Sequence, residues 1–305
     1  MKDQKNTPPP LRDAATIILV REKNKALEVY ILRRSNQSTF MGGLYVFPGG
    51  VVESDDRKID TWAPQIDMTL DEIGTRLGGK RFSREAALGF GVAAIRETLE
   101  EAGILIASGQ DKTQKDFDEI SRYRLNRNLP NSWFQTKMTA DDWTLSFSHL
   151  GRWSHWITPT RMKKRFDTRF FIVFMPENQT CAPDDRETKH GIWLTPQTAL
   201  EQNLDGQTPL SPPAVVTLTH LSAFTNLKNL KQEIKNRSWG DPIIPRLLPS
   251  ANGPVILEPW DPMWDEGGDD TNEMNTSNLS QKLLPPGAPF SRLWCDKGVW
   301  KPIGQ

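Results

Sequence analysis

Three glutamates, Glu97, Glu100 and Glu101, stand close together in the sequence. In a helix with 3.6 residues per turn they fall at about 0°, 300° and 40° around the axis, within an arc of roughly 100°. Carboxylates this close repel one another unless a cation lies between them, and Mg²⁺ is a hard cation that takes oxygen ligands and bridges to substrate phosphates. The spacing therefore indicates a metal platform for phosphate chemistry. A solvated Glu-rich face, supported by nearby Lys or Arg, is the common alternative.

The flanking residues predict the elements that position these acids. Small and apolar residues recur through 86–102, which predicts a packed helix with Ser83 as its N-cap and Gly103 as the residue that ends it. Upstream, a Pro-Gly-Gly turn follows a short strand at 44–47. The runs 14–20 and 27–33 predict a hairpin, and strands and helices then alternate without a strict βαβ period. This order favours an α/β fold with a mixed sheet between helices.

Composition sets bounds on the protein class. A chain of 305 residues can bury a substantial core, and one catalytic domain with an extension is the simplest organisation. Its 38 Lys and Arg balance 38 Asp and Glu, so phosphate binding must be local, and neither nucleic acid nor a membrane is expected as a partner. Cys181 and Cys295 match no metal-ligand spacing. The apolar runs are strand-sized, and we expect a cytoplasmic protein.

Two motifs together carry a family resemblance. Phe47-Pro48-Gly49-Gly50 followed by Arg96-Glu97-Thr98-Leu99-Glu100-Glu101-Ala102-Gly103-Ile104 resembles the Nudix hydrolase signature, G-x5-E-x7-R-E-U-x-E-E-x-G-U. The resemblance implies an α/β/α sandwich with a mixed β-sheet. It also implies a hydrolase in which a water activated by Mg²⁺, or by Mn²⁺, attacks a diphosphate.

The resemblance assigns roles to particular residues. It implies that Glu100 and Glu101 are metal ligands and that Glu97 is a ligand or the base that activates water. Gly49 is expected to contribute its carbonyl oxygen as a further ligand. Arg96 is expected to orient one of the glutamates through a bidentate pair rather than to touch substrate.

The signature is interrupted in this chain. Gly50 and Arg96 stand 46 positions apart where the signature has 14, so about 32 residues, 51–82, are inserted. We expect this insertion to be a surface excursion between the turn and the helix. Counted forward from Gly50 the first motif acid is Asp56, but counted back from Arg96 the position holds Leu88. The sequence leaves open whether Asp56 or no residue takes this role.

A narrower resemblance concerns the substrate. The coenzyme A diphosphatase motif, R-S-x3-R-x3-G-x3-F-P-G-G, is matched here with Thr39 in place of its second arginine. With the long insertion and the later blocks 156–159 and 165–171, the chain looks like the Nudix motif 19-like branch, which is associated with hydrolysis of CoA and acyl-CoA. The resemblance implies that substrate is bound by Arg34, Ser35, Gly43 and Phe47.

Two further groups of residues are candidates. The basic cluster of Arg161, Lys163, Lys164, Arg165 and Arg169 could hold the 3′-phosphate of CoA, with Arg165 and Arg169 as the predicted substrate contacts, although a solvated hairpin is equally compatible. Glu187 lies shortly before a predicted strand, where Nudix proteins often place an additional acid, and is a predicted metal ligand.

The expected organisation is a disordered lead at 1–11, a Nudix domain at 12–225 and an extension at 226–305 that packs on the domain, where a homodimer contact could form. The expected reaction cleaves CoA or acyl-CoA to 3′,5′-ADP and 4′-phosphopantetheine or its acylated form. One alternative keeps this chemistry but takes ADP-ribose, NADH or capped RNA as the substrate. Another is a nucleotide-binding module without catalysis.

Overall fold

The computed structural model of the chain describes residues 9–79, 83–184, 188–264 and 282–305. Within these residues a seven-stranded sheet has the order β3-β2-β1-β8-β7, with β4 pairing to β1 and β9 to β2. β1 runs parallel to β8 and the other pairings are antiparallel, so the predicted mixed sheet is confirmed. The strands are β1 (Leu11–Lys23), β2 (Ala26–Arg34), β3 (Tyr45–Val46), β4 (Gly49–Val51), β7 (Gly151–Ile157), β8 (Arg165–Phe174) and β9 (Thr188–Leu194).

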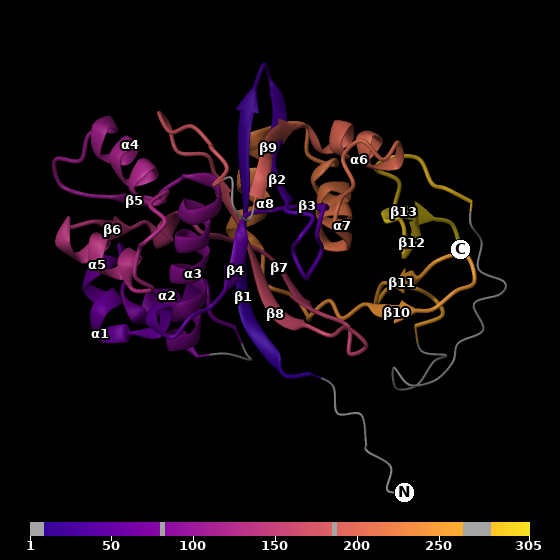
Figure 1. Cartoon of the computed structure of the whole chain (residues 1–305), viewed down its shortest axis with the longest axis horizontal. Coiled ribbons are helices and arrows are strands. Elements are labelled where there is room, and N and C mark those ends of the chain that lie inside the picture. Colours follow the sequence, from indigo (N-terminus) through magenta and orange to yellow (C-terminus); the bar gives the residue numbers. More distant parts are fainter. Residues whose placement is uncertain (1–8, 80–82, 185–187, 265–281) are drawn as a thin grey trace, which may run out of the picture.

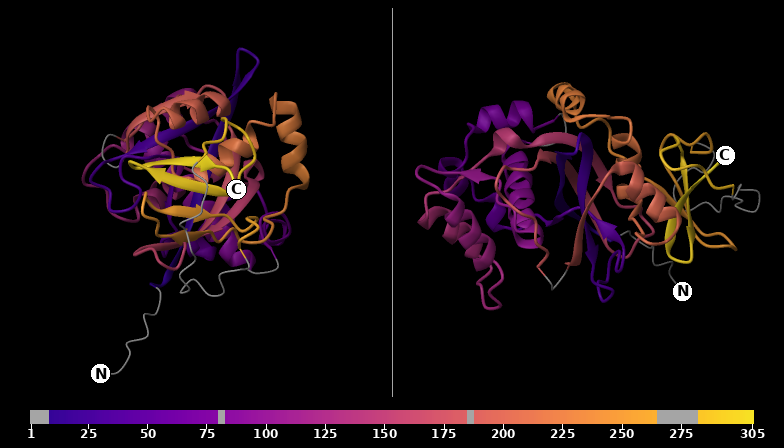
Figure 2. Two further views of the ribbon diagram at one scale, coloured as in Figure 1. Left: turned by 90° about the vertical axis from the view of Figure 1, so that its right-hand side faces the viewer. Right: turned by 90° about the horizontal axis from the view of Figure 1, so that it is seen from above.

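Helices cover both faces of this sheet, as Figure 1 and the view from above in Figure 2 show. One face carries the long helix α3 (Arg84–Ala102), together with α1 (Ile59–Trp62), α2 (Leu70–Arg76), α4 (Gln114–Tyr123) and α5 (Trp133–Ala140). The other face carries α6 (Pro196–Leu204) and α7 (Pro212–Leu221). Short 3-10 turns lie at 55–57, 63–65 and 147–149, and a small ribbon pairs β5 (Ala107–Ser108) with β6 (Thr144–Leu145).

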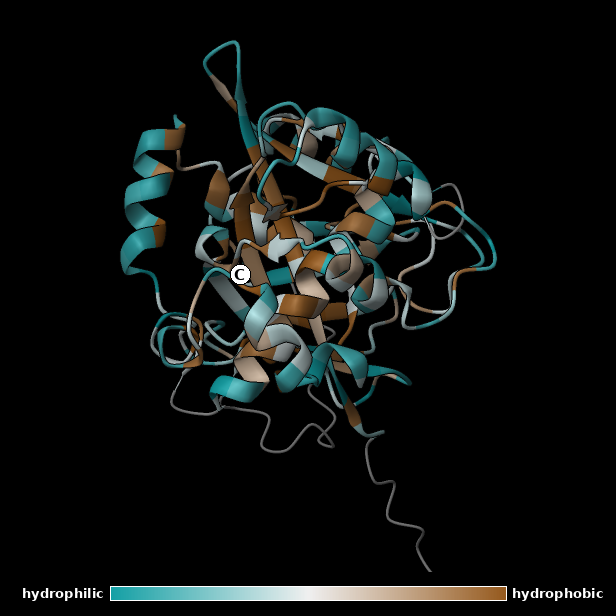
Figure 3. Ribbon diagram, turned by 90° about the vertical axis from the view of Figure 1, so that its left-hand side faces the viewer, coloured by the Kyte–Doolittle hydropathy of each residue, from teal (hydrophilic) through white to brown (hydrophobic). Residues whose placement is uncertain are grey.

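The alternation of side chains along β1 explains the two layers. Ile17 and Leu19 are buried toward α3, whereas Ile18 and Val20 are buried toward α6 and α7. A strand that is apolar on both faces needs a cover on each side, and the hydropathy colouring in Figure 3 shows hydrophobic residues along the strands and hydrophilic ones on outward helix faces. The predicted α/β/α sandwich is therefore the observed fold.

The last part of the chain forms a second sheet. After α8 (Leu227–Asn236), four antiparallel strands follow in the order β10 (Arg246–Leu248), β11 (Val255–Leu257), β12 (Arg292–Asp296) and β13 (Val299–Ile303). Ile256 and Leu293 are buried in the same core as α6 and α7, so this sheet packs beside those helices. In the described part of the chain, no helix combines the length and apolarity that crossing a bilayer requires.

Candidate active site

Helix α3 carries the predicted carboxylates and has the predicted ends. The Ser83 side chain accepts a hydrogen bond from the Ala86 N–H at 3.2 Å, and Gly103 ends the helix in the left-handed region with φ of 74°. Leu99 is fully buried in the core, which turns the acids of the last two turns toward the glycine turn. Because β4 pairs with β1 beneath α3, residues 49–51 lie beside these acids.

Arg96 is the centre of a buried ion-pair network. Its Nε donates to Asp56 Oδ1 at 3.0 Å, and its Nη2 donates to Asp56 Oδ2 and to the Val51 carbonyl, each at 2.9 Å. Its Nη1 donates to Glu97 Oε1 and Glu100 Oε2, each at 2.8 Å. Burial disfavours the charge of Arg96, yet the surrounding carboxylates raise its pKa above the ordinary value. Arg96 therefore holds two glutamates in place, rather than one.

The network places an acid at the first position of the interrupted motif. Asp56 is 1 % exposed and Arg96 is 6 % exposed, so their pair is shielded from water. Asp56 Oδ2 also accepts the Glu53 N–H at 2.8 Å. Leu88, the other candidate position, is fully buried among apolar residues. Of the two candidate positions, Asp56, which is counted forward from Gly50, is thus the residue that pairs with Arg96.

The insertion is not the surface excursion that we expected. Trp62, Ile73 and Leu77 are buried in the core on the α3 side of the sheet. The Trp62 indole Nε1 donates to the Asp55 carbonyl at 2.8 Å, which closes the turn that presents Asp56. The expectation was wrong because the segment carries widely spaced apolar residues that only the folded α1 and α2 bring to one side.

The two glycines of the turn allow close contact with the acids. The Gly49 N–H donates to Glu101 Oε2 at 2.9 Å. A Cβ at Gly50 would lie 2.4 Å from Glu97 Oε1, which is much closer than real Cβ atoms approach. A side chain at this position would therefore displace the Glu97 carboxylate from where it lies. The contact seen at Gly49 uses its N–H, and ligation by its carbonyl stays a prediction.

Two residues that sequence reasoning missed hold Glu100. Trp133, the first residue of α5, donates its indole Nε1–H to Glu100 Oε1 at 2.9 Å. Arg124 donates through Nη1 to the main-chain carbonyl of Glu100 and through Nη2 to the Ala182 carbonyl at 2.6 Å. They lie 33 and 24 positions from Glu100 in sequence, and no motif marks them. Their contacts exist only because α4 and α5 fold back over the end of α3.

The electrostatics of the cluster fit a cation. Burial raises the pKa of Glu97 to about 7, Arg96 opposes this rise, and the charge of Glu100 adds to it. Burial is also the main cause that raises the pKa of Glu100. Carboxylates outnumber cations here, and a divalent cation would relieve that excess. Among the described residues no three ligand groups already converge on one point, because Glu97 and Glu100 face Arg96 and Glu101 faces Gly49.

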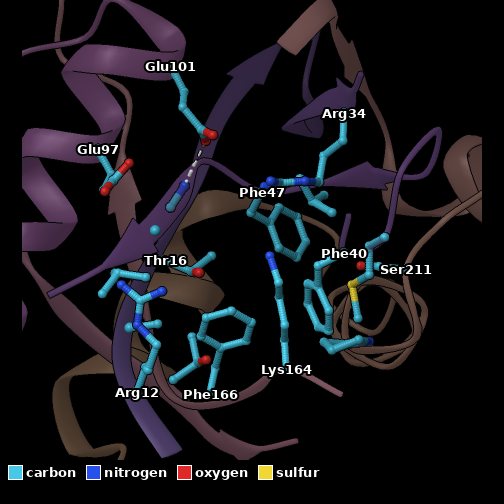
Figure 4. A pocket seen from close by; sticks show the side chains of 18 of the residues that line it. Arg12, Thr16, Arg34, Phe40, Phe47, Glu97, Glu101, Lys164, Phe166 and Ser211 are labelled. Atoms are coloured by element: carbon cyan, nitrogen blue, oxygen red, sulfur yellow. Dashed lines mark hydrogen bonds between the residues drawn. The ribbon is translucent and has the colours of Figure 1, made fainter. Parts of the chain in front are cut away.

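A cleft of about 950 Å³ opens beside the acids, within the range of small-molecule sites (Figure 4). Glu97, Glu100 and Glu101 line one part of it, and the cations Arg12, Arg34 and Lys164 line another. The remaining wall is largely aromatic and apolar, and it includes Phe40, Met41, Phe47, Trp156, Phe166, Phe170, Pro212, Leu247, Ile256 and Trp300. The second sheet thus contributes side chains to the same cleft as α3.

Only some of the predicted substrate-binding residues line this cleft. Arg34 and Phe47 do, whereas Ser35 and Gly43 are not among its lining residues. The Ser35 hydroxyl instead accepts the Gln37 N–H at 3.3 Å, and Gly43 turns the chain with φ of 79°. These two residues shape the β2–β3 connection from outside the cleft.

Arg165 and Arg169 do not line the cleft, contrary to expectation. Arg165 donates to the Thr158 carbonyl at 3.2 Å, and Arg169 pairs with Asp167 and lies over the Phe90 ring on the α3 side. The physical reason is the two-residue period of β8, because positions 166, 168 and 170 line the cleft and the odd positions point to the opposite face. Glu187, the predicted additional metal ligand, lies outside the described residues.

This sandwich, with a buried Arg–acid network and a carboxylate helix beside a glycine turn, is the architecture of a Nudix protein. A NUDIX hydrolase of known structure from Alicyclobacillus acidocaldarius shares the fold, with a TM-score of 0.58 and 22% identity, over 76% of this chain and 99% of that one. The family model described as the NUDT19 Nudix domain matches residues 11–221, and the chain belongs to that family.

Curated relatives extend the similarity beyond the matched domain. The chain is 28% identical to the acyl-coenzyme A diphosphatase NUDT19 of Xenopus laevis, over 87% of this chain and 80% of the relative. It is 27% identical to the protein of that name from Homo sapiens, over 88% of this chain and 81% of the relative.

Proposed function

We propose that this protein hydrolyses the diphosphate of coenzyme A or acyl-CoA and releases 3′,5′-ADP and 4′-phosphopantetheine or its acylated form. The observation that carries the proposal is the cleft in which the carboxylates of α3, cations that include Arg12, Arg34 and Lys164, and an extended apolar wall lie together. The names of the curated relatives support the same substrate class.

The chain offers oxygen ligands for a metal ion beside the cleft. Glu97, Glu100, Glu101 and the Gly49 carbonyl would hold Mg²⁺, or Mn²⁺. When bound, such an ion stabilises charge on the diphosphate oxygens and lowers the pKa of a bound water. Arg96 lines the cleft as well, but its N–H donors are used by carboxylates and the Val51 carbonyl, so its role is to position the acids.

The rest of the cleft fits the two ends of a CoA molecule. Cations suit the phosphates of the nucleotide portion, because charge-assisted hydrogen bonds are the strong ones at such sites. The apolar residues of the second sheet, Leu247, Ile256 and Trp300, suit the pantetheine arm and an acyl chain. A diphosphate bound at the acids would lie between these two regions.

The test is a product assay on the purified chain with Mg²⁺. CoA, acyl-CoA, ADP-ribose, NADH and capped RNA are offered in parallel, and products are identified by mass spectrometry. Glu101→Gln is expected to lower kcat at least a hundredfold, because it removes a charge that would face the metal. Glu85→Gln changes an acid in the first turn of the same helix and serves as the matched control. Cleavage of another substrate with CoA left intact contradicts the proposed substrate, and no cleavage favours a binding module.

A further inference from the structure

Several of the cations that line the cleft have no carboxylate partner among the described residues, and Arg12, Arg34 and Lys164 are three of them. Arg12, Arg34 and Lys164 form no ion pair in the described part of the chain, although other arginines around the site do. A cation that faces a cavity and is not neutralised by the protein creates a local positive potential there. Figure 4 shows Lys164 and Arg34 across the cavity from Glu97 and Glu101, and Arg12 below Glu97.

Lys164 is held in the cleft by a neutral group. Its Nζ donates to the Thr39 hydroxyl at 2.6 Å, which joins the β7–β8 connection to the β2–β3 connection, 125 positions apart in sequence. A hydroxyl acceptor fixes the position of the ammonium group and leaves its charge uncompensated. Position 39 is also where the coenzyme A diphosphatase motif carries its second arginine. The ammonium group of Lys164 therefore lies beside Thr39, at the position where the motif has a positively charged side chain.

Arg34 has unused donors at the same place. Its Nη2 donates to the Ser38 hydroxyl at 3.1 Å, while its Nε is buried and has no hydrogen-bond partner. A guanidinium has five N–H donors, and a protein seldom leaves a buried one unsatisfied unless a ligand supplies the acceptor. Arg34 and Lys164 together are thus equipped to receive an anion with several acceptor oxygens.

We propose that Lys164, positioned by Thr39 and assisted by Arg34, binds the phosphate on the ribose 3′-oxygen of a CoA-type substrate. The assignment rests on the proposed function. The proposed function puts the diphosphate at the acids of α3, and within the described residues neither Lys164 nor Arg34 pairs with those acids, so we assign these two cations to a second phosphate. The CoA nucleotide carries one on its 3′-oxygen.

The experiment compares two nucleotides that differ only by this phosphate. Isothermal titration calorimetry gives the Kd of 3′,5′-ADP and of 5′-AMP for the full chain and its variants, with no turnover required. Lys164→Met is expected to weaken 3′,5′-ADP binding about tenfold and to leave 5′-AMP within about twofold, since it removes one charge-assisted contact. Lys163→Met is the matched control, because Lys163 is exposed on the same hairpin and does not line the cleft.

Charge restoration tests the role of position 39. Lys164→Arg is expected to keep the preference for 3′,5′-ADP, and the double variant Thr39→Arg with Lys164→Met is expected to recover affinity to within about threefold. An equal loss for both nucleotides in Lys164→Met, or no loss for either, overturns the assignment. A double variant as weak as Lys164→Met overturns the claim that Lys164 replaces a charge at position 39.

This test is separable from that of the proposed function. If CoA is not cleaved but Lys164→Met selectively weakens 3′,5′-ADP, the phosphate site stands and the proposed reaction fails. If CoA is cleaved and Lys164→Met leaves both affinities unchanged, only the phosphate site fails.

Discussion

Asp56→Asn probes the acid that completes the interrupted motif. The substitution keeps the size of the side chain but removes its charge. Asp56 accepts three hydrogen bonds, two from Arg96 and one from the Glu53 N–H. An amide can accept at one oxygen only, so its NH₂ group would face a donor.

The expected loss of stability follows from burial. Removing one partner of a buried ion pair costs about 3–5 kcal/mol when the other charge is left unpaired. Arg96 keeps its contacts to Glu97 and Glu100, so its charge stays partly compensated and we expect a loss at the low end, about 3 kcal/mol. At an unfolding entropy of about 2.1 cal/mol/K per residue, this lowers Tm by about 5 °C for the 305-residue chain.

The assay is urea and thermal unfolding of Asp56→Asn beside Asp55→Asn. Asp55 is the neighbouring acid, and its side chain pairs with Lys58 at the surface, where such pairs contribute about 0–1 kcal/mol. The control is therefore expected to lose less than about 1 kcal/mol. Equal effects of the two substitutions would refute the reasoning, because they would show that the Asp56–Arg96 pair is not a buried anchor of the site.

Three further outcomes are expected. Gly50→Ala forces Glu97 to move, because the new Cβ would lie 2.4 Å from its oxygen, and steady-state kinetics should show kcat lowered about a hundredfold. Trp133→Phe removes the indole donor from Glu100, so a titration of activity against Mg²⁺ should show half-activation at a concentration about fivefold higher, whereas unchanged half-activation would contradict this role. Burial without a hydrogen-bond partner raises the pKa of Glu258 to about 8, so the protonated form favours the folded state and the free energy of unfolding should fall as pH rises from about 4.5 to about 8. Glu258→Gln should be on the order of 3 kcal/mol more stable than the parent at pH 7 and about equal to it at pH 4, as measured by urea unfolding, and parallel pH profiles would count against this explanation.

Local patterns were sufficient for much of the fold and for part of the site. The helix from Arg84 to Ala102 has its cap and its terminating glycine within one turn of its ends, so neighbouring residues determine where it starts and stops. The glutamates share a face because residues three and four positions apart always do so in a helix. The two-sided burial of β1 likewise follows from a continuous apolar run.

The tertiary structure decided the rest, because it depends on contacts between distant segments. Which residue pairs with Arg96 was ambiguous by counting, and the folded insertion brings Asp56 to it across 40 positions. The face on which Arg165 and Arg169 lie depends on the register of β8 against β1, where a shift of one residue would reverse both. Lys164 reaches Thr39 only because two loops meet at one end of the cleft. The sequence by itself thus determined the chemistry, which resides in short-range spacing, and the three-dimensional fold determined which cations line the cleft.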